Sequence, residues 1–184
     1  MRREKDLIDV LHRLTDHPTP ITLADMSKSD APLIFANRAF GRLTGYVTDF
    51  VIGKNCRILQ GVGTDPDAVE RLRQDIAARR QTFHCLLNYR QDGTEFHNLL
   101  MLAPIDLHAN RDYVIGCQYE FFETVKDAEL LDQIDAQCGA LREVESFNNT
   151  RWDLLKRGVC ARTESVRLKV DSYFARERAR RARY

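Results

Sequence analysis

The chain has 184 residues, of which 43% are hydrophobic and 30% charged, and its formal net charge is +1. This composition is typical of a soluble globular protein with one domain plus extensions, or with two small domains. No apolar run approaches the roughly 20 residues that a membrane span needs, and the charged N-terminus does not resemble a signal peptide. The five cysteines are widely spaced without metal-ligand spacing. We therefore expect free thiols, no metal and a cytoplasmic location.

The first third of the chain predicts a helix, two strands and a second helix. Apolar side chains recur at helical spacing across residues 3–14, which predicts a short amphipathic helix. Segments 21–25 and 32–37 are rich in strand formers and flank a turn-rich stretch. Residues 37–46 predict a short helix that Gly45 closes.

A third helix, with a clear start, is predicted near the middle of the chain at residues 64–81. Thr64 or Asp65 can cap it, and Pro66 suits its first turn. Three β-rich runs follow and predict an antiparallel meander: residues 82–90, 94–105 and 112–122.

The chain changes character after residue 122, where apolar residues again recur at helical spacing. We expect three parts: an N-terminal amphipathic helix at 1–18, a domain at 19–122 and a C-terminal helical extension at 123–184. The order of elements predicts an α+β fold with one antiparallel sheet.

Two arginines suggest an anion site. Arg73 lies beside Leu72 on the predicted inward face of its helix, where a guanidinium is costly unless an anion meets it. Arg57 directly follows Cys56, and two converging arginines suit a phosphate. The alternative for Arg73 is a side chain that reaches the surface.

Three amide side chains interrupt otherwise apolar strands. Asn88 and Asn98 lie on the same sheet face if their hairpin loop has an odd number of residues, such as Gln91 to Gly93. A two-residue loop would place them on opposite faces. Gln118 shares its face with Gly116, which leaves room for a flat group. Such a pocket fits flavin mononucleotide (FMN), although each residue alone has a purely structural explanation.

The sequence around Cys56, "GKNCRILQ", resembles the signature of LOV (light-oxygen-voltage) domains, the flavin-binding blue-light sensors of the PAS superfamily. "NYRQDGTEFHN" and "IGCQ" match the hairpin and the final strand of that family. Ile58 departs from the usual Phe, and Phe50 and Gln91 stand where plant members have a surface Glu–Lys pair. The resemblance implies a PAS/LOV fold with a five-stranded antiparallel sheet and flanking helices.

The resemblance also implies a role for each matched position. Cys56 would be the photoreactive thiol, which forms a reversible adduct with flavin carbon C4a under blue light. Gln118 would face flavin N5, and Gln60 would contact the ribityl chain or the phosphate region. The remaining expected FMN contacts are to the polar rim (Asn55, Asn88, Asn98), the phosphate (Arg57, Arg73) and the ring pocket (Leu86, Leu100, Leu102).

The resemblance implies a light switch and not an enzyme. We expect the signal to reach the helices after residue 122 and to change the affinity of a homodimer, without a membrane and with an unknown downstream protein partner. One rival is a light-regulated nucleic-acid-binding protein, because residues 151–184 hold eleven Lys and Arg against four Asp and Glu. A solvated basic tail explains that excess better. The other rival, a flavin redox protein, lacks a nicotinamide motif in this sequence.

Overall fold

The computed structural model describes residues 11–12, 14–108 and 111–121, with positions 176, 179–180 and 182 near the C-terminus. The chain divides into two compact units, Met1–Glu120 and Phe121–Tyr184. Most of the predicted N-terminal helix and nearly all of the C-terminal extension lie outside the described residues. Among the residues described, no helix is both long and apolar enough to cross a membrane.

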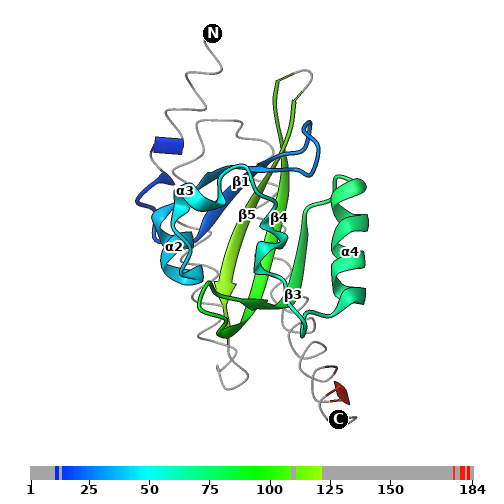
Figure 1. The fold of residues 1–184 in the computed structure, drawn as a ribbon. Coiled ribbons are helices and arrows are strands. Elements are labelled where there is room, and N and C mark those ends of the chain that lie inside the picture. Colours follow the sequence, from blue (N-terminus) through cyan, green and yellow to red (C-terminus); the bar gives the residue numbers. More distant parts are fainter. Residues whose placement is uncertain are drawn as a thin grey trace. The chain divides into compact units, whose positions relative to one another are not determined.

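A single antiparallel sheet forms the centre of the first unit (Figure 1). Its spatial order is β2-β1-β5-β4-β3, so among the described strands the first, β1, pairs with the last, β5. The predicted α+β fold with a five-stranded antiparallel sheet is confirmed. The strands are β1 (Ile21–Asp25), β2 (Leu33–Ala36), β3 (Thr82–Tyr89), β4 (Glu95–His108) and β5 (Arg111–Glu120).

The helices that connect β2 to β3 begin and end where local chemistry predicts. In α2 the Asn37 side chain accepts from the N–H of Phe40, and Gly45 ends the helix with a left-handed φ of 74°. In α4 Asp65 is the cap. Thr64, the other candidate, instead donates to the Leu87 carbonyl at 2.7 Å. The four helices are α2 (Arg38–Thr44), α3 (Thr48–Val51), the 3-10 helix η1 (Cys56–Leu59) and α4 (Pro66–Ala77).

Helix α4 packs on the sheet through an apolar face. Val69 and Leu72 are buried, and Ile76 is partly buried beside them. They join sheet residues in one apolar cluster: Leu86, Leu100, Leu102 and Val114. This contact fixes the side of the sheet on which a cavity can form.

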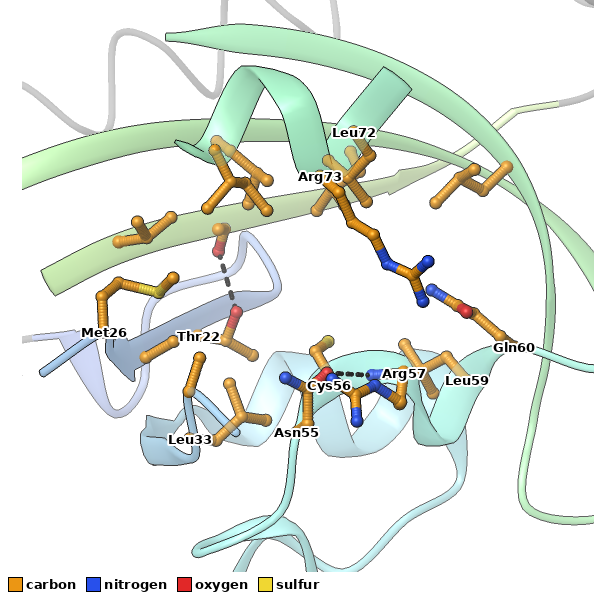
Figure 2. A pocket seen from close by; sticks show the side chains of 18 of the residues that line it. Thr22, Met26, Leu33, Asn55, Cys56, Arg57, Leu59, Gln60, Leu72 and Arg73 are labelled. Carbon is orange, nitrogen blue, oxygen red and sulfur yellow. Dashed lines mark hydrogen bonds between the residues drawn. The ribbon is translucent and has the colours of Figure 1, made fainter. Parts of the chain in front are cut away.

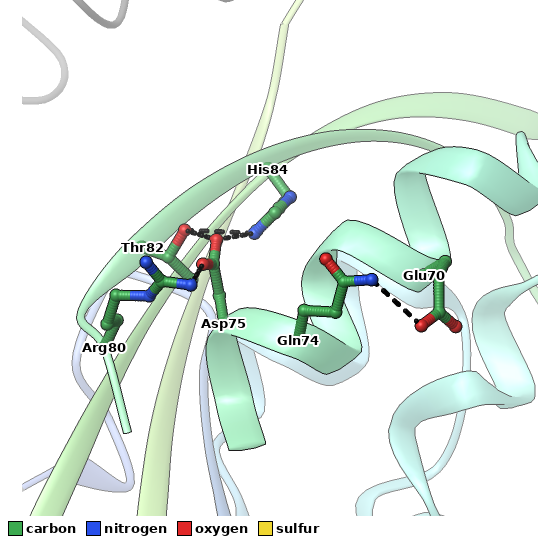
Figure 3. A network of polar contacts seen from close by, with 6 residues as sticks. All are labelled: Glu70, Gln74, Asp75, Arg80, Thr82 and His84. Carbon is green, nitrogen blue, oxygen red and sulfur yellow. Dashed lines mark hydrogen bonds and ion pairs between the residues drawn. The ribbon is translucent and has the colours of Figure 1, made fainter. Parts of the chain in front are cut away.

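Polar contacts fix the C-terminal end of α4 to β3 (Figure 3). The Asp75 carboxylate accepts from the Thr82 hydroxyl at 2.8 Å, and the His84 ring nitrogen Nε2 lies 3.1 Å from the same oxygen. Arg80 pairs with the other carboxylate oxygen at 3.1 Å. With the Thr64 hydrogen bond at its start, α4 is anchored to β3 near both ends.

Candidate functional site

A cavity of about 480 Å³ lies between the sheet, η1 and α4 (Figure 2). Its volume is that of a typical small-molecule site. Side chains from β1, η1, α4 and the three meander strands line it. All eleven residues that the sequence predicted as flavin contacts are among them: Asn55, Cys56, Arg57, Gln60, Arg73, Leu86, Asn88, Asn98, Leu100, Leu102 and Gln118.

The sheet wall of the cavity follows from strand alternation. Residues two apart on each strand face the same side, and the register places Leu86 opposite Asn98 and Leu100 opposite Gln118. Polar and apolar side chains from three strands are thereby brought onto one wall. No single strand could supply this arrangement.

The hairpin between β3 and β4 decides the relative position of the two asparagines. Arg90 donates its N–H to the Thr94 carbonyl, which leaves a three-residue loop from Gln91 to Gly93, and Gly93 is left-handed at φ 84°. The odd loop puts Asn88 and Asn98 on one face, and Asn98 Nδ2 donates to Asn88 Oδ1 at 2.9 Å. The same-face alternative is therefore the correct one.

The inner end of the cavity, defined by Asn88, Asn98 and Gln118, is buried and only partly satisfied. These side chains are 3%, 1% and 0% exposed. Gln118 Nε2 donates to Thr22 Oγ1 at 3.2 Å, whereas Asn98 Oδ1 and Gln118 Oε1 have no hydrogen-bond partner. Such orphaned buried acceptors are costly, so two acceptors remain for donors of a ligand.

Gly116 keeps the wall beside Gln118 flat. A Cβ atom on Gly116 would lie 2.8 Å from Thr22 Oγ1, 3.1 Å from Gln118 Nε2 and 3.2 Å from Leu102 Cδ2. No ordinary side chain fits there without displacing its neighbours. This agrees with the prediction of space for a flat group beside Gln118.

Cys56 begins η1 and faces the cavity opposite the sheet (Figure 2). The Asn55 side chain caps η1 by accepting from the N–H of Arg57 at 2.9 Å. The thiol is half-buried because it faces the cavity instead of bulk solvent, and desolvation raises the pKa of Cys56 to about 12. At neutral pH the group is therefore a neutral thiol that keeps its proton.

The mouth of the cavity, defined by Lys28, Asp30, Arg57 and Arg73, carries paired and exposed charges. Arg57 Nη1 lies 2.5 Å from Asp30 Oδ1, with both side chains more than half exposed. Lys28 lies 3.8 Å from the buried Asp25. The rim thus supplies cations to an anionic ligand, although each cation already has an acidic neighbour.

The prediction that Arg73 lies on the inward face of α4 was wrong. Its side chain is 65% exposed and pairs with Glu70 at 3.6 Å on the same helix. Figure 2 shows its guanidinium extended toward Gln60. The long side chain carries the charge to the cavity mouth while Leu72 fills the core, so no buried anion is needed to explain it.

The sequence reasoning missed two charged residues of the mouth, Lys28 and Asp30. Both lie in the turn between β1 and β2. A turn-rich stretch of polar residues gives no signal for ligand contact. Their proximity to η1 arises from the pairing of β1 and β2 and from contacts across the mouth.

Comparison with known proteins places these residues in a family. Residues 18–127 match the model of the PAS domain. The chain is 44% identical over 126 residues to blue-light-activated histidine kinase 2 of Erythrobacter litoralis, which is 68% of this chain and 36% of that protein. It is 42% identical over 83 residues to phototropin-1A of Oryza sativa subsp. japonica, 45% of this chain and 9% of the relative. The chain thus spans about a third or less of these relatives.

Solved structures give the same family. A LOV domain from a blue-light-activated histidine kinase of Erythrobacter litoralis superposes with a TM-score of 0.54 at 42% identity, covering 58% of this chain and 98% of that chain. The Rhodobacter sphaeroides LOV protein superposes with a TM-score of 0.76 at 27% identity, covering 89% of this chain and 96% of that chain.

Proposed function

The chain belongs to the PAS domain family, as a member of its LOV branch, and from this premise we propose that it is a blue-light photoreceptor that binds FMN. The observation that carries the proposal is the placement of a neutral thiol, Cys56, across one cavity from buried amides with unpartnered oxygens. Relatives named for blue-light activation or as phototropins support the light input.

The described residues fit a flavin. The ring would lie against the apolar part of the wall, and its polar edge would meet Asn88, Asn98 and the cap residue Asn55. The unpartnered Asn98 Oδ1 suits the one ring N–H donor of an oxidised flavin, whereas the Gln118 amide would meet ring N5, an acceptor in darkness, through its N–H end. Arg57 and Arg73 would hold the phosphate, Gln60 would contact the ribityl chain or the phosphate, and apolar contacts would come from Leu86, Leu100 and Leu102.

A bound flavin supplies absorption of blue light and, once excited, an electrophilic ring carbon, C4a. The Cys56 sulfur would then bond to that carbon, its S–H bond would break, and its proton would pass to ring N5. Because burial raises the pKa of Cys56 to about 12, the thiol keeps its proton and would supply both the sulfur that bonds to the ring carbon and the proton that passes to N5. The reverse transfer in darkness would restore the free thiol.

Gln118 is placed to report the change. Its amide accepts at one end and donates at the other, so rotation can answer a new N–H on the ligand. At present Nε2 donates to Thr22 Oγ1, while the backbone N–H donates to Pro20. Rotation of the amide would alter the contact with β1 near the end of β5, which continues into the predicted helical extension.

We propose a switch and not an enzyme, with output through a light-dependent homodimer. No step consumes a substrate, and light would bias a two-state element. The alignment with the histidine kinase spans 126 residues, which is only 36% of that relative. Kinase activity therefore forms no part of the proposal.

The test compares the purified protein with Cys56→Ala in darkness and under blue light. We expect bound flavin in both proteins, reversible bleaching in the wild type and none in the variant, because only the wild type has the thiol. Scattering on the same samples should show a change in mass or shape in the wild type alone. A colourless protein that takes up no added flavin, or a wild type that never bleaches, would refute the photoreceptor proposal; unchanged scattering would refute only the dimer output.

A further inference from the structure

Asp30 contacts the residues on both sides of Cys56. Its backbone carbonyl accepts from Asn55 Nδ2 at 2.6 Å, and its carboxylate pairs with Arg57 Nη1 at 2.5 Å. Asp30 lies in the β1–β2 turn, 25 residues before Asn55. One turn residue therefore orients the two side chains that flank the reactive position.

The turn presents these two groups through an unusual backbone. Asp30 and Ala31 are both left-handed, with φ of 67° and 44°. Aspartate tolerates this conformation, whereas alanine rarely adopts it. Such geometry persists where the surroundings hold it and is common at functional sites. Here it directs both the carbonyl and the carboxylate of Asp30 to η1.

The Asp30 charge makes the two arginines of the mouth unequal. Arg57 faces a carboxylate at 2.5 Å, whereas Arg73 faces Glu70 at 3.6 Å. Both pairs are more than half exposed, so each interaction is weak and a phosphate can compete for the guanidinium. The Asp30 carboxylate would nevertheless stay close to the bound phosphate and repel it.

We propose that Asp30 is a positioning residue that orients Asn55 and Arg57 around Cys56 and, through its negative charge, limits the preference of the site for FMN over riboflavin. The inference rests on the proposed flavin function. It assigns Arg73 the larger share of phosphate recognition, because its acidic partner is farther away.

The test measures FMN and riboflavin affinity by fluorescence titration at low ionic strength. Asp30→Asn removes the charge and keeps a residue that tolerates left-handed backbone. We expect the ratio of riboflavin Kd to FMN Kd to rise about three- to tenfold, because one carboxylate no longer repels the phosphate. A merely structural role would weaken both flavins equally and leave the ratio unchanged.

Asp16→Asn is the matched control. Asp16 forms an exposed ion pair with Arg38 at 2.7 Å and does not line the cavity, so its removal should leave the ratio unchanged. If Asp30→Asn fails to fold, Asp30→Gly tests the same charge on a backbone that is free to be left-handed.

Two results would overturn the inference: an unchanged ratio in Asp30→Asn, or an equal rise in Asp16→Asn. Each leaves a wild type that binds FMN and bleaches under blue light, so the photoreceptor proposal survives. If the wild type binds neither flavin, the proposed function fails and this inference fails with it.

Discussion

The inner end and the mouth of the cavity differ in burial and in how far their polar groups are already paired. At the inner end, Asn98 and Gln118 are almost fully buried and keep unpartnered oxygens. At the mouth, Arg57 and Arg73 are more than half exposed and already contact carboxylates. Burial makes each inner hydrogen bond strong and each missing one costly, whereas water and salt weaken the outer charges. We infer that the inner end selects the flavin ring and the mouth tunes affinity for the phosphate.

The largest effect of a substitution on flavin affinity is expected at the inner end, in Gly116→Val. A new side chain would displace Thr22, Gln118 and Leu102, all of which line the cavity. Overpacking of about 1–3 kcal/mol corresponds to roughly five- to 150-fold weaker binding of both FMN and riboflavin. Fluorescence titration measures it. Ile115→Val, one residue earlier on β5, is the control, and equal losses in the two variants would contradict a special role for Gly116.

Removal of the flavin should lower the free energy of unfolding, because the buried amide oxygens then lack hydrogen-bond partners. FMN at a hundred times its Kd should add about 2.7 kcal/mol to the free energy of unfolding, measured by urea denaturation. Gln118→Leu should narrow that gap by about 1 kcal/mol, because it removes an orphaned acceptor from the flavin-free protein and an amide–ring hydrogen bond from the FMN-bound protein.

The opposite result for Gln118→Leu is also informative. If the variant destabilises the flavin-free protein as strongly as the FMN-bound form, Gln118 Oε1 is not a burden in the absence of ligand. The contrast between an inner end with unpartnered acceptors and a mouth with ion-paired charges would then be wrong.

The smallest effect is expected away from the cavity lining, where Asp75 fixes the C-terminal end of α4 to β3. Hydrogen bonds from Thr82, then from His84, and the charges of His84 and Arg80 outweigh desolvation and hold the pKa of Asp75 below its usual 3.8. A carboxyl group with a depressed folded-state pKa stabilises the protein above its unfolded-state pKa, and this contribution is lost as pH falls through the folded-state value.

Asp75→Asn should therefore reduce stability by about 1 kcal/mol at pH 7, and the difference from wild type should shrink as pH falls below about 4. Chemical denaturation across this range measures it, with Asp16→Asn as the exposed control. A difference that stays constant down to pH 3 would show that ionisation of Asp75 contributes nothing.

Much of the candidate site was predictable because its signals are local. Cys56 and its neighbours lie in one short run, and the meander positions repeat with the two-residue period of strands. Gly45 and Pro66 marked helix ends that the structure bears out. The sequence did not decide whether Asn88 and Asn98 share a sheet face, because only the hydrogen-bonded register shows that the hairpin loop has three residues.

The side-chain direction of Arg73 and the contacts of Asp30 could not be predicted from the sequence. Sequence spacing put Arg73 beside Leu72 but could not show that its side chain turns to the mouth. No pattern in the turn before β2 predicted that Asp30 contacts Asn55 and Arg57. Contacts between segments far apart in the chain depend on how the sheet and helices pack, and spacing along the chain does not encode that packing.

The sequence by itself determined the elements, the thiol and the amides, since caps, turns and strand periodicity act over a few residues. The tertiary structure alone decided the strand order β2-β1-β5-β4-β3, the cavity that gathers those groups, and the charges that compete at its mouth. These features arise where distant segments bury surface against one another, and that burial is a property of the folded chain as a whole.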